Sequence, residues 1–163
     1  LCPGVIAGEY SAESTAFQNF RYPEILADLA AIRSLLHQVN PAIRLLLTVS
    51  PVPLTATASG NHVLAATIRS KASLRAAAGD FAADHDDVDY FPSYEIITSP
   101  ASRGQWYEPN LRQVRASGVA RVMSCFLPAY GLADAYIAAP PASQVDEPAS
   151  VICEEQLLEA FSG

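Results

Sequence analysis

The most informative stretch of this chain for its fold is residues 45–63, LLLTVSPVPLTATASGNHV. An apolar run ends there at a Ser-Pro-Val-Pro segment. The run begins near Ala42, is rich in Leu, Ile and Val, and has a proline at each end. Short runs of this kind are typical of strands buried on both faces of a parallel sheet. The sequence therefore predicts a strand at Leu45–Val49, followed by a loop over residues 50–60.

A helix is predicted on each side of this strand. The first begins at Pro23 and ends at Asn40-Pro41. Its apolar residues recur every three or four positions, at Ile25, Leu29, Ile32, Leu36 and Val39. The second helix is expected to begin after Asn61, which can cap it, and to end at Gly79. His37 lies where an imidazolium meets the negative end of the first helix, so we expect a structural role for it.

A second strand and a third helix follow. Residues 84–89, DHDDVD, form an acidic turn that leads into a strand at Val88–Phe91, and a second extended piece can follow Pro92. A third helix is expected at residues 111–126, although Gly118 weakens it by about 1 kcal/mol. Alternating helices and strands predict an α/β protein with a parallel sheet. Two strands cannot form such a sheet alone, so further strands lie in the poorly patterned ends or outside this chain.

The composition changes after Tyr130. Residues 131–150 are rich in Ala and Pro and are predicted to be a linker. Residues 151–163 have apolar positions at helical spacing and are predicted to form a short amphipathic helix. The chain is thus expected to hold a domain over residues 1–130, a linker and a terminal helix. Residue 1 is Leu rather than Met, so the chain can be a fragment.

Composition and charge argue against several classes of function. The 163 residues carry a net charge of −7 and no basic stripe, so nucleic acid is not an expected partner. Three widely spaced cysteines without C-x-x-C spacing indicate neither a disulfide framework nor a zinc site, and they favour a reducing, cytoplasmic location. No window has the roughly 18–20 apolar residues of a membrane span. The oligomeric state is left open.

No metal or cofactor is expected either. The acidic run at residues 84–89 precedes a strand and lacks the glycine and distal glutamate of an EF-hand. No glycine-rich phosphate or dinucleotide loop follows either predicted strand. For the same reason, a methyl- or acyltransferase on a similar α/β fold is the least favoured alternative.

Four ordered blocks point to a family: LLLTVSPVPLTAT, HVLAATIRSKASLRAAA, YFPSYEII and YEPNLRQVRASGVARVM. Together they resemble the C-terminal half of the GSCFA domain family, bacterial proteins grouped with the SGNH or GDSL-like hydrolases. The resemblance covers roughly residues 1–130. It implies a flavodoxin-like three-layer α/β/α fold and a serine ester or acyl hydrolase. The substrate is left open, and a small-molecule or glycan ester is the candidate class.

The residues that the family's mechanism needs are not all in this chain. The Gly-Ser-Cys-Phe-Ala segment that names the family is absent, so the resemblance implies a nucleophilic serine upstream of residue 1. The Asp-x-x-His block before the last helix corresponds to Asn110–Gln113, where neither the acid nor the histidine is present. This difference supports an alternative, a non-catalytic binding or scaffolding domain derived from the same fold.

His62 is the candidate catalytic residue. The run Ser59–His62 spells SGNH by coincidence, because the four residues of that name come from separate loops that converge in space, and an oxyanion hole needs donors that reach one carbonyl oxygen from different directions. His62 nevertheless lies in the connection that leaves the first strand, and open α/β sheets bind ligands outside the carboxyl ends of their strands. It can act as a general base toward an upstream serine. The alternative is a solvated histidine in the first turn of a helix.

Ser50, Ser70 and Lys71 are candidates for binding substrate. Ser50 directly follows the first strand, and the prolines at 51 and 53 lack N–H groups, so they either stiffen a pocket wall or simply end the strand. Lys71 can hold a negatively charged group of the substrate, with Ser70 beside it. The alternative for this pair is a solvated cationic helix face.

Tyr94 and Glu95 are the remaining candidates, because they follow the second strand at the same expected edge. A carboxylate at Glu95 can orient a histidine, as the acid of a catalytic triad does. In the alternative, Tyr94 packs in the core and Glu95 pairs with an arginine such as Arg103 or Arg112.

Overall fold

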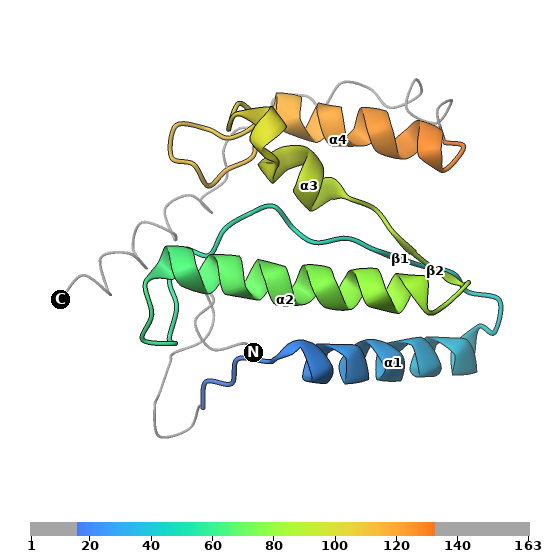
Figure 1. Cartoon of the computed structure of the whole chain (residues 1–163). Helices are drawn as coiled ribbons and strands as arrows, with labels where there is room; N and C mark the ends of the chain where they lie inside the picture. Colours follow the sequence, from blue (N-terminus) through green and yellow to red (C-terminus); the bar gives the residue numbers. More distant parts are fainter. Residues whose placement is uncertain (1–15, 133–163) are drawn as a thin grey trace.

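The computed structural model describes residues 16–132, which form a mixed α/β structure (Figure 1). The elements of this part of the chain are α1 (Tyr22–Val39), β1 (Leu45–Leu47), α2 (Val63–Ala83), β2 (Val88–Tyr90), α3 (Ser93–Thr98), the short 3-10 helix η1 (Pro100–Ser102) and α4 (Ala116–Ala129). The predicted terminal helix at residues 151–163 and nearly all of the predicted linker lie outside the described residues.

The two strands pair in parallel, as predicted. Leu45 lies opposite Val88 and Leu47 opposite Tyr90. The Leu45 N–H donates to Asp87 O at 2.8 Å, and the Phe91 N–H donates to Leu47 O at 2.8 Å. Alternate residues of a parallel strand face the same neighbour, so the N–H and C=O of Leu46 point away from β2.

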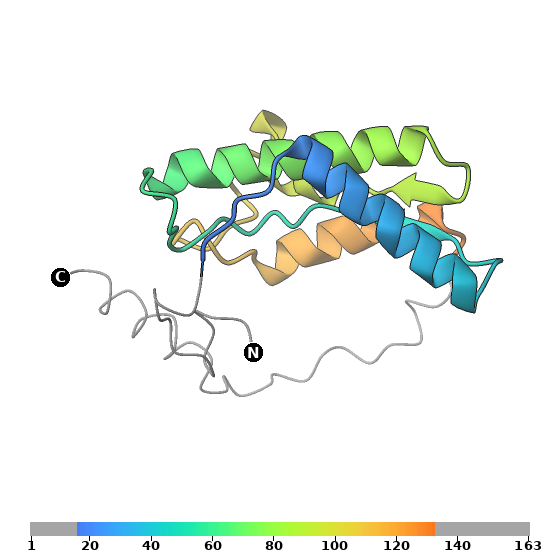
Figure 2. The same ribbon diagram turned by 90° about the horizontal axis from the view of Figure 1, so that it is seen from below.

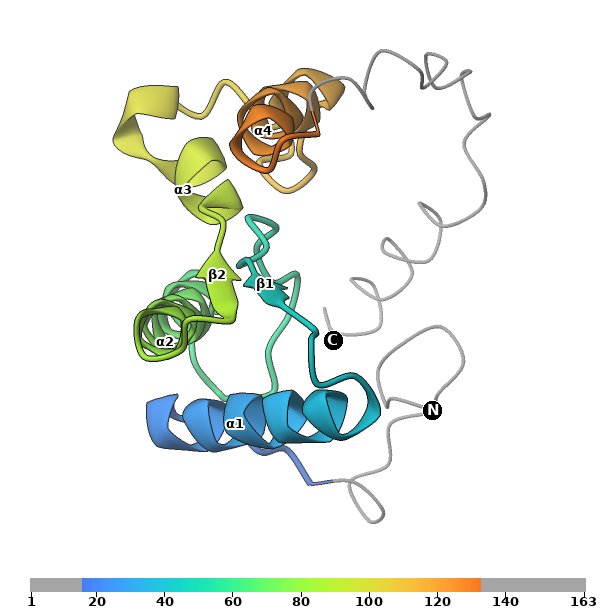
Figure 3. The same cartoon turned by 90° about the vertical axis from the view of Figure 1, so that its right-hand side faces the viewer.

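Helices cover both sides of the strand pair. Helices α1 and α2 lie on one side, and α3 and α4 lie on the other (Figure 3). Seen from below, α1 crosses α2 at an angle (Figure 2), and the Tyr22 hydroxyl of α1 donates to Asp80 of α2 at 2.6 Å. No residue of α1 is buried within the described structure.

The core lies where α2 and α3 meet the strands. Ala77, Ala78 and Phe81 of α2 are buried, as is Val88 of β2, and the small alanines allow the helix to approach the sheet closely. On the other side, Ile97 of α3 is 1% exposed. The ring of Phe91 packs edge-on against Phe126, with 5.1 Å between ring centroids, which joins α4 to the end of β2.

Asp87 anchors α1 to the turn between α2 and β2. The Arg33 guanidinium donates to both oxygens of its carboxylate at 2.7–3.1 Å, and His37 Nε2 lies 2.7 Å from Oδ2. The bonds from Arg33, and after them the contact with His37, hold the pKa of Asp87 well below its usual range, against the opposing effect of desolvation. His37 therefore has a structural role, and this member of the acidic turn is ion-paired rather than simply solvated.

The boundaries of α2 differ from the prediction at both ends. The N-cap is His62 rather than Asn61, because the His62 ring accepts a hydrogen bond from the backbone. The helix also continues past Gly79 to Ala83. Gly79 does not end the helix. A Cβ at this position would collide with the guanidinium of Arg75, so the glycine makes room for that side chain.

Two further expectations are wrong. Residues beyond Pro92 form α3 instead of an extended piece. The last helix begins at Ala116, five residues later than predicted, because the residues before it form an antiparallel bridge between Tyr107 and Val114. Within residues 16–132 the structure contains no helix with both the length and the apolar character needed to cross a membrane.

Candidate functional site

The chain leaves both strands at one shared edge of the sheet. Thr48 Oγ1 donates to Phe91 O at 2.9 Å, and Ser93 Oγ donates to Val49 O at 3.1 Å. These side-chain hydrogen bonds hold the two segments together beyond the last backbone hydrogen bond between the strands. In open α/β folds this carboxyl edge is where ligands bind.

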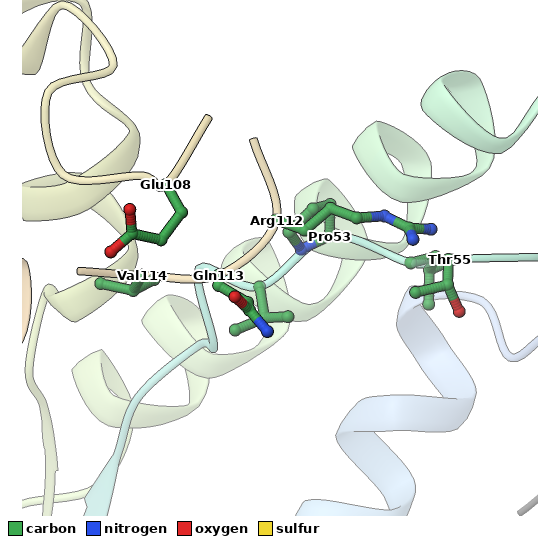
Figure 4. A pocket seen from close by; sticks show the side chains of 8 residues that line it. Pro53, Thr55, Glu108, Arg112, Gln113 and Val114 are labelled. Carbon is green, nitrogen blue, oxygen red and sulfur yellow. The ribbon is translucent and has the colours of Figure 1, made fainter. Parts of the chain in front are cut away.

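A pocket of about 680 Å³ opens on this side of the molecule (Figure 4). Its first wall is the loop after β1, and its second is the hairpin at residues 107–114. The lining residues are Val52, Pro53, Leu54, Thr55, Glu108, Arg112, Gln113 and Val114. Glu108 and Arg112 lie toward opposite ends, and the guanidinium of Arg112 points to the side where Thr55 lies (Figure 4). Pro53 lines the pocket, as one interpretation of the proline pair predicts.

The hairpin base is tied to the loop that it faces. Tyr107 and Val114 form the antiparallel bridge, and the Glu108 N–H donates to Gln113 O at 2.8 Å. The Tyr107 hydroxyl donates to Pro51 O at 2.8 Å. Burial, and to a lesser degree the neighbouring Tyr94, raises the pKa of Tyr107, which keeps its hydroxyl in the donating form. This bond fixes the separation of the two pocket walls.

Asn110 shapes the tip of the hairpin. Its side-chain oxygen accepts from the N–H of Arg112 at 3.0 Å and of Gln113 at 3.1 Å. Leu111, between them, has a φ of 57°, a left-handed conformation that is uncommon for a leucine. A side-chain oxygen that captures two N–H groups stabilises such a tight turn. Asn110 thus holds Arg112 and Gln113 in the pocket wall.

His62 caps α2 at the N-terminus. Its Nδ1 accepts a hydrogen bond from the Leu64 N–H at 3.2 Å, and the side chain is exposed. In a neutral ring with an accepting Nδ1, the proton is on Nε2. A general base needs a free lone pair, so catalysis through Nε2 would require the other tautomer and would break the cap.

Ser50 lies in the loop after β1, whereas Ser70 and Lys71 are neighbours on α2. Ser50 is exposed, and its hydroxyl accepts from the Val52 N–H at 3.2 Å. Ser70 and Lys71 are half-buried in the middle of α2. The Thr67 hydroxyl accepts a hydrogen bond from the loop after β1. Lys71 comes one helical turn after Thr67, so both side chains face that loop. Burial lowers the pKa of Lys71, in contrast to a freely solvated lysine.

Glu95 belongs to a polar cluster beneath the carboxyl edge. It forms an ion pair with Arg75 of α2, and the Tyr90 hydroxyl donates to it at 3.0 Å. The Arg75 guanidinium also lies 4.1 Å from the centre of the Tyr90 ring. Burial, followed by the bond to Glu95, raises the pKa of Tyr90 to about 12. The arginine paired with Glu95 is therefore neither Arg103 nor Arg112.

Within residues 16–132, no hydrogen bond or ion pair joins any two of the six candidates, and none of them lines the pocket. No group of three His, Cys, Asp or Glu side chains in this part of the chain could hold a metal ion. Sequence reasoning missed Tyr107 and the role of Arg112 in the pocket. The Glu-Pro-Asn sequence at 108–110 was an available signal for a turn.

Comparison with known proteins identifies the family. A sequence model of the GSCFA family matches residues 2–126, well over half of the chain. No curated protein and no solved structure matches the chain. The match includes β1, β2, both pocket walls and most of α4, so the fold and the pocket described above are features of the matched region. The chain therefore belongs to the GSCFA family.

Proposed function

We propose that this chain is the C-terminal part of an SGNH/GDSL-like serine ester or acyl hydrolase with a three-layer α/β/α fold. The observation that carries the proposal is the pocket at the carboxyl edge of a parallel strand pair, in a member of the GSCFA family. Residues that precede this chain supply the nucleophilic serine and the oxyanion hole. The substrate is a small-molecule or glycan ester.

The reaction would proceed through an acyl-enzyme. The serine hydroxyl attacks the ester carbonyl while a base takes its proton, the alcohol leaves, and water then hydrolyses the acyl-serine. In this scheme the pocket walls bind and orient the substrate. His62 is the candidate base of this chain, provided that its ring leaves the capping geometry and presents an unprotonated Nε2.

The test compares this chain with one extended upstream to include a Gly-Ser-Cys-Phe-Ala segment. Hydrolysis of 4-nitrophenyl acetate and labelling by a fluorophosphonate are measured for both. We expect turnover and serine labelling only in the extended chain. Turnover by the 163-residue chain at a rate above that of its heat-denatured control would contradict the proposal.

A non-catalytic binding domain is the second candidate, because Asn110 and Gln113 occupy the positions of the family's Asp-x-x-His block. Asn110 provides the turn-stabilising oxygen that an aspartate would also provide, but it lacks the charge. The discriminating variant of the extended chain combines Asn110→Asp with Gln113→His. An inactive parent with an active double variant would indicate a domain that has lost its chemistry. An active parent favours the hydrolase.

A further inference from the structure

We propose that the pocket between the loop after β1 and the hairpin is a recognition subsite for a carboxylate on the substrate, with Arg112 as its charged donor. The substrate class is then an ester that carries a second, ionised carboxylate on a short alkyl chain. The expected effect on kcat/KM rests on the proposed hydrolase function, whereas the expected binding of a carboxylate does not.

The first wall has few backbone N–H groups to offer a ligand. Pro53 has none, the Val52 N–H donates to Ser50 Oγ at 3.2 Å, and the Leu54 N–H donates to Thr67 Oγ1 at 3.1 Å. An oxyanion hole is commonly built from free backbone N–H groups aimed at one oxygen. This wall is therefore unsuited to stabilise a reacting carbonyl.

The second wall is similar. The Glu108 N–H is bonded to Gln113 O, and the N–H groups of Arg112 and Gln113 are both bonded to Asn110 Oδ1. Six of the eight lining residues thus have no free backbone N–H. Donors to a ligand must come mainly from the side chains of Arg112, Gln113 and Thr55. Such side-chain donors are suited to bind a group of the substrate, and the reacting carbonyl would be stabilised by other parts of the site.

The charges of the pocket favour an anion. Glu108 pairs with Arg115, with 3.4 Å between Nε and Oε2. No ion pair joins Arg112 to a carboxylate within residues 16–132. A guanidinium presents two parallel N–H groups that match the two oxygens of a carboxylate. Val52, Pro53, Leu54 and Val114 supply apolar surface within the same pocket, which suits a short alkyl chain.

The binding test uses the 163-residue chain and two probes of nearly equal size, butanoate and neutral butanamide. Titrations are followed by the NMR signals of the Arg112 side chain, the Gln113 amide and Thr55. We expect these signals to move with butanoate and its dissociation constant to be about ten-fold lower than that of butanamide. Arg112→Gln should remove the preference, whereas the control Arg121→Gln, on the exposed face of α4, should retain it.

Two results would overturn the subsite: equal affinity for the two probes, or an unchanged preference in Arg112→Gln with folding confirmed by circular dichroism. Tighter binding of methyl phosphate than of butanoate would overturn the assignment to a carboxylate. In the extended chain, the ratio of kcat/KM for 4-nitrophenyl hemisuccinate to that for 4-nitrophenyl butanoate should fall about ten-fold in Arg112→Gln. Carboxylate binding without any esterase activity would refute the hydrolase alone.

Discussion

At the scale of single residues, Gly118 determines how closely α4 approaches the hairpin. The sequence suggests only that this glycine weakens a helix. In the structure it is buried in the first turn of α4, and a Cβ there would lie 2.9 Å from Val114 Cγ1 and 3.0 Å from Trp106 Cβ. The Trp106 carbonyl oxygen, at 3.2 Å, adds a backbone atom that cannot rotate away. The glycine is therefore required by close packing.

Gly118→Ala should destabilise the protein by about 1–3 kcal/mol, the usual effect of overpacking, despite the better helix propensity of alanine. Urea denaturation followed by circular dichroism measures the change in the free energy of unfolding. The neighbouring exposed Ser117→Ala is the control and should stay within about 0.5 kcal/mol of the parent. A Gly118→Ala protein as stable as the parent would show that the first turn of α4 can move away from Trp106.

At the scale of elements, the start of α2 depends on an unusual cap. An imidazole nitrogen does what a serine, aspartate or asparagine oxygen usually does. His62→Ala should lower the free energy of unfolding by about 0.5–2 kcal/mol, and His62→Asn should restore it, because asparagine is a strong N-cap. Thermal or urea unfolding of the three proteins checks this order.

The same pair of variants separates capping from catalysis. In the extended chain, His62→Asn keeps the helix start and removes the imidazole. If His62 is the base, esterase activity should fall in both variants. Activity that follows stability, lost in His62→Ala and regained in His62→Asn, would leave His62 with a structural role only.

Asp87 connects α1 to the α2–β2 turn, and its contribution depends on pH. The folded pKa of Asp87 is lowered, so the stabilisation is fully present above the unfolded value of about 3.9 and is lost as the pH falls below it. Asp87→Asn should therefore lower Tm at pH 6, and the difference from the parent should begin to shrink as the pH falls below about 4. Thermal denaturation monitored by circular dichroism across this range measures it.

Asp86→Asn is the matched control, one residue away and exposed. Its side chain makes no ion pair within residues 16–132. The Tm difference between this variant and the parent should be small at every pH. A difference for Asp87→Asn that stays constant down to pH 3 would mean that the contact with Arg33 does not depend on the carboxylate charge.

The elements that the sequence predicts well are those with a strong local pattern. The apolar stripe of α1 and the Leu-rich run of β1 are visible in the letters alone. α3 was missed because it has only six residues, Ser93–Thr98, and so short a segment shows no clear helical or strand periodicity. The end of α2 was misplaced because glycine marks helix ends and close contacts alike, and only the position of Arg75 separates the two.

At the scale of the whole molecule, the pocket exists because two distant segments meet. Tyr107 and Pro51 are 56 residues apart, and their hydrogen bond fixes one wall against the other. The sequence could therefore indicate the edge of the sheet where a ligand binds, since that follows from parallel pairing. It could not indicate the role of Arg112, because the place of that side chain depends on how the hairpin folds back onto the loop.

Tyr107→Phe should loosen this arrangement without unfolding the domain. Loss of one hydrogen bond worth about 0.5–1.5 kcal/mol should speed amide exchange at Val52 and Leu54 by about three- to ten-fold. Hydrogen–deuterium exchange measures this effect, with the Val88 amide as an internal reference and Tyr130→Phe as the control variant. Unchanged exchange at Val52 and Leu54 would show that the loop is held by its own bonds to Ser50 and Thr67.

The orientation of Leu46 has a practical consequence. Its peptide groups face outward, its side chain is 41% exposed, and no strand within residues 16–132 pairs with that margin of the sheet. An unpaired edge strand can pair with a strand of another molecule, and natural sheets often prevent this with a lysine on the edge strand. Concentrated solutions of the chain should therefore scatter light as copies stack edge to edge, and Leu46→Lys is the first substitution to make before crystallisation.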